Sequence, residues 1–148
     1  MKKKLLINVL FVLFFINTNV LSKESSYFIE GMKHFKKKEF DKSKIFFERD
    51  LVFNPRSEKS YLYLAKIFEK KENIEEEEIN LKNVLLLNPK NDEAIYMLTL
   101  IKINQSNYSE AEKLINTFTL VCKSFCSKKK EIELKFKKLN PENAKKNN

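Results

Sequence analysis

Cys122 and Cys126 are the two cysteines of the chain, and they stand four residues apart. In an oxidising compartment, cysteines at this spacing can form a disulfide if a turn brings their β-carbons together. A metal site would need further ligands, and the single histidine, His34, is far away in the sequence. Haem attachment expects Cys-x-x-Cys-His, and thiol redox catalysis expects Cys-x-x-Cys in a mixed α/β fold. We therefore expect a structural disulfide, with free thiols and then a catalytic pair as the weaker alternatives.

The acidic run at residues 75–78 is the other cluster with chemical potential, because four glutamates could hold a cation. Asn73 stands just before the run and can cap a helix that begins there. Negative charge in a first helical turn stabilises the positive end of the helix dipole, and we favour this role over cation binding. The chain offers no acid/base pair, phosphate-binding loop or metal constellation. We therefore expect no catalytic residue, no metal and no cofactor, and we expect that the protein is not an enzyme.

The composition indicates an all-α protein. The chain has 148 residues with 1 Gly and 3 Pro, too few for a sheet with many tight turns. Its 43% apolar content is enough for a packed interior and excludes wholesale disorder.

The positive charge is concentrated at the two ends of the chain. The formal net charge is +9, and Lys2, Lys3 and Lys4 lie in a segment that we expect to be removed. Residues 123–148 carry 9 basic and 3 acidic side chains. Such a tail could contact a phosphate-bearing surface such as an anionic membrane, although we favour a solvated terminal helix.

Residues 1–22 have the layout of a secretory signal. The three lysines precede an apolar stretch at 5–16 and a polar exit at 17–22, and we expect cleavage after Ser22. The protein would then be periplasmic or secreted, which excludes a nucleic-acid partner. The alternative is an uncleaved anchor in the inner membrane through residues 5–21, although polar residues interrupt this stretch.

A period of 34 residues runs through the middle of the chain. Asn54-Pro55 recurs as Asn88-Pro89, and a polar break divides each unit into two helical apolar series. The period predicts helix, turn, helix in each unit. The matching residues are Tyr27, Gly31, Phe40, Phe47 and Pro55, then Tyr61, Ala65, Ile74, Leu81 and Pro89, then Ile95, Leu98, Tyr108, Ala111, Ile115 and Phe118.

These residues resemble the tetratricopeptide repeat (TPR), whose pattern spans 34 positions. The resemblance implies an all-α, right-handed superhelical stack of three units at 24–57, 58–91 and 92–125. Glu30 replaces a usual Leu, Asp50 and Glu77 stand at positions of small apolar residues, and Lys123 replaces the last proline. A stack needs an end cap, and we expect a capping helix at 126–139 followed by a disordered tail at 140–148. The apolar stripe of this capping helix would consist of Ile132, Phe136 and Leu139.

In this repeat family the first helices of successive units line a concave groove that binds peptides or partner helices. Carried over by position, the groove residues would be Phe28, Ile29, Met32, Phe35 and Lys36 in unit one, Leu62, Tyr63, Lys66 and Lys70 in unit two, and Tyr96, Met97, Leu100 and Ile103 in unit three. Contiguous exposed apolar surface of this kind marks an interaction site. The alternative is that these side chains are core, covered by the chain itself or by self-association.

We therefore expect an exported scaffold that holds a protein or peptide partner in an apolar groove, in a process such as envelope assembly. The alternative is a membrane-tethered assembly factor, held by an uncleaved N-terminal anchor or by peripheral contact of the basic tail.

Overall fold

The computed structural model describes residues 24–140, and this part of the chain is entirely helical. The predicted all-α fold class is confirmed. The expected signal at 1–22 and all but the first residue of the expected tail lie outside the described residues. The elements are α2 (Ser26–Lys36), α3 (Phe40–Phe53), α4 (Glu58–Lys70), α5 (Ile74–Leu87), α6 (Asp92–Asn104), α7 (Tyr108–Val121), the short 3-10 helix η1 (Cys126–Lys128) and α8 (Lys129–Leu139).

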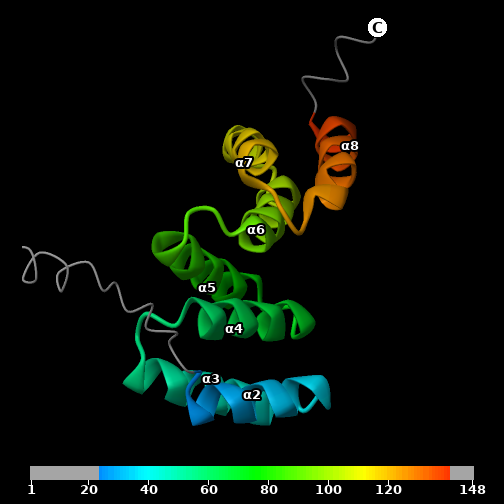
Figure 1. Ribbon diagram of the computed structural model, residues 1–148. Coiled ribbons are helices and arrows are strands. Elements are labelled where there is room, and N and C mark those ends of the chain that lie inside the picture. The colour runs from blue at the N-terminus through cyan, green and yellow to red at the C-terminus, as the bar shows by residue number, and fades with distance from the viewer. Residues whose placement is uncertain (1–23, 141–148) are drawn as a thin grey trace, which may run out of the picture.

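The helices pack as consecutive pairs. α2 packs on α3, α4 on α5, and α6 on α7, and each pair contacts the next along the stack (Figure 1). α8 closes the stack by packing against both α6 and α7. No helix within residues 24–140 is long and apolar enough to cross a membrane.

The turn inside each pair has the same backbone geometry. Lys38, Glu72 and Ser106 are 34 residues apart, and each has a positive φ, of 61°, 56° and 59°. The amide that follows each of them donates to a carbonyl five residues back, as for Asn73 and Phe68 at 3.0 Å. This is the Schellman ending of a helix. The period is therefore a structural repeat as well as a sequence repeat.

Asparagine starts the second helix of the last two pairs. The Asn73 side chain accepts from the amide of Glu76, and the Asn107 side chain accepts from the amide of Glu110. In the first pair Glu39 occupies this position, and its carboxylate contacts the His34 ring instead of capping α3. The capping role expected for Asn73 is confirmed, and Asn107 caps α7 in the same way.

Two of the pattern's departures, Asp50 and Glu77, are buried acids. Asp50 is fully buried between α3 and α4, and its carboxylate accepts hydrogen bonds from the hydroxyls of Ser25 and Ser60. Glu77 is 7% exposed. A buried carboxylate needs hydrogen-bond or ion-pair partners. Asp50 has two hydroxyl donors, whereas the Glu77 carboxylate forms no hydrogen bond or ion pair within residues 24–140.

Candidate functional site

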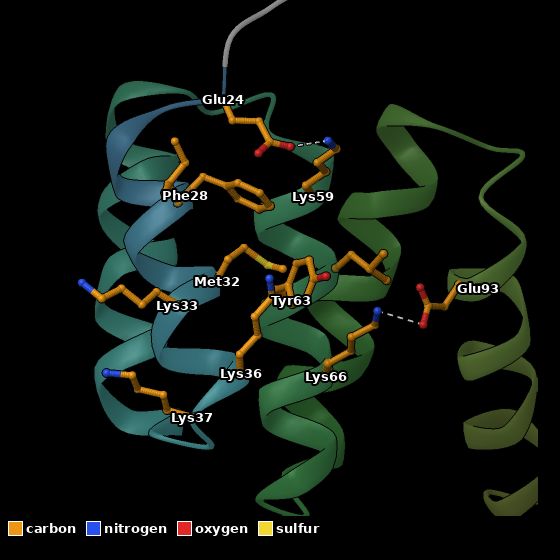
Figure 2. A pocket seen from close by; sticks show the side chains of 12 residues that line it. Glu24, Phe28, Met32, Lys33, Lys36, Lys37, Lys59, Tyr63, Lys66 and Glu93 are labelled. Atoms are coloured by element: carbon orange, nitrogen blue, oxygen red, sulfur yellow. Dashed lines mark hydrogen bonds and ion pairs between the residues drawn. The ribbon is translucent and has the colours of Figure 1, made fainter.

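A large open cavity lies between α2 and α4. It has a volume of about 740 Å³ (Figure 2). The predicted groove residues Phe28, Ile29, Met32, Lys36, Leu62, Tyr63 and Lys66 line it, together with Glu24, Lys33, Lys37, Lys59 and Glu93. We call this cavity the α2–α4 groove.

Aromatic rings form a fixed floor for the α2–α4 groove. Tyr63 stacks on Phe47 at 5.3 Å between ring centroids, and Phe28 meets Tyr63 edge-on at 5.9 Å. Phe28 and Phe47 are buried, whereas Ile29 on the lip is 50% exposed. Figure 2 shows Met32 beside Tyr63 between the two helices. The floor is therefore apolar, held in place by the core beneath it, and open to solvent.

Lysines form the rim of the α2–α4 groove. Lys59 pairs with Glu24 at 2.5 Å, and Lys66 pairs with Glu93 at 2.8 Å while also lying 4.8 Å from the centre of the Tyr63 ring. These pairs are drawn as dashed lines in Figure 2. The two ion pairs tie the start of α2 to α4, and α4 to α6.

Three further lysines extend the rim along α2. Lys33 pairs with Glu30 on the same helix at 3.1 Å. Lys36 and Lys37 form no ion pair within residues 24–140, and both are exposed. With five lysines and two glutamates among the lining residues, the rim carries a positive excess that suits an acidic partner.

The third unit contributes less to this surface than the sequence predicts. Tyr96, Met97 and Ile103 are 9%, 7% and 1% exposed, and α8 packs against α6, the helix that carries them. The Tyr96 hydroxyl donates to Glu131 of α8 at 2.7 Å, and burial together with this bond raises the pKa of Tyr96 to about 12. The expected groove is therefore covered at this end by the chain itself.

The remaining predicted residues other than the buried Ile103 line smaller cavities. Phe35, Lys70, Tyr96 and Met97 border a cavity of about 320 Å³, which shares Lys66 and Glu93 with the α2–α4 groove. Met97 and Leu100 also border a third cavity, farther along the stack, of about 230 Å³.

Of the five rim lysines, Lys36 and Lys66 were predicted from the sequence, whereas Lys33, Lys37 and Lys59 were not. Lys33, Lys36 and Lys37 follow the spacing i, i+3, i+4, which places them along one side of α2. Met32 and Phe35 occupy neighbouring positions on the same helix. The spacing of these lysines beside the apolar residues of the same helix was enough to predict an apolar groove with a basic edge.

The predicted cysteine pair lies where the chain leaves α7. Cys122 and Cys126 are within disulfide distance, with their Cα atoms 5.2 Å apart. The carboxylate of Asp92 accepts from the three amides of Lys123, Ser124 and Phe125 at 2.6, 2.6 and 2.9 Å. Burial would raise the pKa of Asp92, but these backbone bonds outweigh it and lower the pKa. Asp92 and the cysteine pair both brace the loop that directs α8 onto α6.

The acidic run divides into solvated and buried members. Glu75 and Glu76 are exposed in the first turn of α5. Glu78 accepts from Lys102 at 2.6 Å and pairs with Lys82 at 2.5 Å. Within residues 24–140 no group of three or more His, Cys, Asp or Glu side chains is arranged to hold a metal ion.

Comparison with known proteins supports the fold. No family model matches the chain, and no curated protein matches it. Among solved structures, the CopN-Scc3 complex matches with a TM-score of 0.63 and 19% identity, over 78% of this chain and 77% of that one. The Sgt2 TPR domain from Aspergillus fumigatus matches with a TM-score of 0.55 and 16% identity, over 81% and 76%. The chain therefore has the fold of TPR domains.

Proposed function

We propose that this TPR fold serves as a protein-interaction scaffold without catalytic activity, and that the α2–α4 groove holds a segment of a partner protein. The observation that carries the proposal is a solvent-open apolar floor that the chain's own core keeps rigid. Tyr63 is held by Phe47 and Phe28, so binding costs little side-chain entropy there. Rigid aromatic anchors of this kind dominate the energetics of protein interfaces.

The shape and charge of the groove suggest the partner's chemistry. A volume of about 740 Å³ accommodates several side chains, and the floor between Met32 and Tyr63 suits apolar ones. The lysine rim favours acidic residues on either side of these apolar ones, because Lys36 and Lys37 form no ion pair within residues 24–140. The proposed partner segment is therefore apolar at its centre and acidic at its flanks.

A matched pair of surface variants tests the groove. Ile29→Glu places a carboxylate on the groove lip, and Val52→Glu makes the same kind of change on α3, where Val52 is 76% exposed and outside the groove. Proteins crosslinked to each full chain in its native host would be quantified by mass spectrometry. We expect Ile29→Glu to reduce capture of the groove partner at least tenfold and Val52→Glu to retain it. Equal partner sets for both variants would reject the groove.

A second matched pair tests the role of the rim charge. Lys36→Glu reverses a charge at the groove, and Lys42→Glu reverses one on an exposed part of α3. We expect the first variant alone to weaken capture and to reduce its dependence on salt concentration. Equal weakening by both would assign the effect to net charge rather than to the groove.

We also propose that the protein acts outside the cytoplasm, for example in envelope assembly, after cleavage near Ser22. The cysteine pair supports this, because disulfides persist in oxidising compartments. N-terminal sequencing of the exported protein should return Lys23, and a start at Met1 would favour the tethered alternative. Fractionation at high salt separates the two tethers, because only contact through the basic tail is released by salt.

A further inference from the structure

The third cavity, which Met97 and Leu100 border, lies between α4, α5, α6 and α8, apart from the α2–α4 groove. Its volume is about 230 Å³, and it shares no lining residue with the groove. A single turn of helix would need about 400 Å³, given a helix diameter of about 10 Å. The cavity therefore suits one side chain or a small molecule. Its lining residues are Glu69, Ile74, Glu77, Met97, Leu100, Ile101, Asn104, Gln105 and Lys135.

Glu77 is the unusual member of this cavity. It is 7% exposed, and its side chain has no hydrogen-bond or ion-pair partner within residues 24–140. Its neighbour Glu78 has Lys82 and Lys102, and the buried Asp50 has two serine hydroxyls. No fully buried side-chain oxygen within residues 24–140 lacks a partner, so the Glu77 oxygens reach the cavity, where burial of the rest of the side chain leaves the carboxylate partly desolvated. A group that supplies the missing partner would offset this desolvation on binding.

The charges around Glu77 define the sign of the group that fits. Burial and, to a smaller extent, the nearby Glu69 raise the pKa of Glu77 to about 7, although Lys70 opposes both. Lys70 is paired with Glu69 at 3.4 Å, and Lys135 of α8 lines the cavity without an ion pair to Glu77. α6 presents uncharged amides, Asn104 and Gln105. Near neutral pH the cavity therefore holds an ionisable carboxylate that lacks its own counter-ion.

The walls define the rest of the ligand. Ile74, Met97, Leu100 and Ile101 are apolar and suit a methylene chain, while the carboxylate suits a cationic end. A metal ion would need several oxygen ligands, and the described residues contain no cluster able to hold one. We propose that this cavity binds a primary alkylammonium group, with the Glu77 carboxylate as counter-ion and the α5 and α6 side chains around its stem.

Methionine methyl NMR on the full chain provides a direct test. Met97 lines the cavity, and Met32 lies in the α2–α4 groove, so one labelled sample contains a reporter and an internal control. At pH 8, n-butylammonium chloride should shift the Met97 signal saturably and leave Met32 unmoved, while the neutral isostere n-butanol should give no saturable shift. Absence of a saturable Met97 shift would overturn the proposal, whatever the outcome for the groove.

Variants identify the carboxylate that is responsible. Glu77→Gln should weaken n-butylammonium at least tenfold, and Glu75→Gln, on the exposed part of the same helix, should leave it unchanged. Lys135→Met keeps an unbranched apolar side chain at this position and removes a positive charge that repels the ammonium ligand. This variant should therefore bind n-butylammonium more tightly. The Met97 chemical shift of each unliganded variant reports whether the cavity is intact. Equal affinity of wild type and Glu77→Gln would reject Glu77 as the counter-ion.

Two further arms complete the experiment. Lowering the pH from 8 to 5.5 should weaken n-butylammonium at least tenfold, because Glu77 becomes protonated while the amine stays charged. A blocked peptide, acetyl-Gly-Lys-Gly-amide, distinguishes the sources of the ammonium. Binding of this peptide would assign the cavity to a lysine side chain of a protein, and binding of n-butylammonium alone would assign it to a small amine.

Discussion

The two seams between neighbouring pairs use opposite chemistry at equivalent positions. In the seam where α3 meets α4, Asp50 accepts from Ser60. In the seam where α5 meets α6, the residues 34 positions later are Val84 and Ala94. All four are 0% exposed.

The difference shows what the repeat requires at these positions. Both seams need small side chains at these positions to fill the gap between the helices. Such a side chain can be polar if the neighbouring unit supplies its hydrogen-bond partner. Ser25, which caps α2, supplies the second hydrogen bond to Asp50. The polar seam thus ties three helices together through one carboxylate, whereas Val84 and Ala94 contribute packing alone at the equivalent positions of the apolar seam.

Replacing the acid should give the largest effect. Asp50→Val removes the acceptor of the buried Ser60 hydroxyl and of the half-buried Ser25 hydroxyl, and we expect it to lower the free energy of unfolding by about 4 kcal/mol. Asp50→Val with Ser60→Ala reproduces the side chains of the apolar seam and should recover most of this loss. Urea unfolding of the wild type and the two variants measures both changes. A double variant as unstable as the single one would show that the seams are not interchangeable.

Glu77 lies on α5, next to the apolar seam. The titration of its carboxyl group should change the free energy of unfolding with pH. The folded pKa of Glu77 is raised from 4.5 to about 7, so between these values the folded state binds more protons than the unfolded state. Stability should therefore fall as the pH rises from 4.5 to 7, by up to about 3 kcal/mol. Urea unfolding across this range measures the slope, and Glu77→Gln should flatten it.

Glu78, the next residue, is the matched control with the opposite sign. Burial would raise its pKa, but hydrogen bonds from Lys102, Lys82 and Gln105 outweigh burial and lower the pKa to about 2. Its contribution is present above pH 4.5 and is lost as the pH falls through 2. Glu78→Gln should lower the stability at all pH values above 4.5 and flatten only the acid limb of the pH dependence. A loss of the slope between pH 4.5 and 7 instead would contradict the assignment of that slope to Glu77.

Within the pairs, the repeats balance volume between two facing positions. Gly31 faces Phe47, and the equivalent positions hold Ala65 with Leu81. In the third pair they hold Thr99 with Ile115. A larger residue on the first helix of a pair thus accompanies a smaller residue on the second helix. The combined side-chain volume is maintained although the residue types differ.

Breaking this balance should cost about 2 kcal/mol. A Cβ at position 31 would lie 2.7 Å from the Phe47 ring, which is fully buried and cannot move aside. Gly31→Ala should therefore lower the thermal midpoint despite its better helix propensity. Gly31→Ala with Phe47→Leu imitates the second pair and should recover the loss. Additive effects in this double-mutant cycle would contradict direct coupling.

The sequence predicted the helix pairs because their signals are local. Apolar spacing, Asn73 as a cap and Pro55 as a terminator each act within one helix or turn. The partners of Asp50 could not be predicted, because Ser25 lies 25 residues away and only the packed stack brings them together. The path of the chain after Cys122 was also unpredictable, because the third unit lacks a proline there and the Asp92 contacts set the direction of α8. This path is what covers Tyr96 and narrows the groove.

The turns provide the smallest and most uniform test, because they do not differ between units. Glu72 has φ 56°, a conformation that costs a non-glycine residue about 1 kcal/mol. Glu72→Gly should therefore raise the free energy of unfolding by roughly that amount, less the added entropy of the unfolded chain. Lys38→Gly and Ser106→Gly should act alike. Glu75→Gly, in the first turn of α5, should instead destabilise by about 1 kcal/mol. Unequal increases in the free energy of unfolding at the three turns would show that the seams strain the turns next to them. Equal increases would show that the repeats differ in energy at the seams and not at the turns.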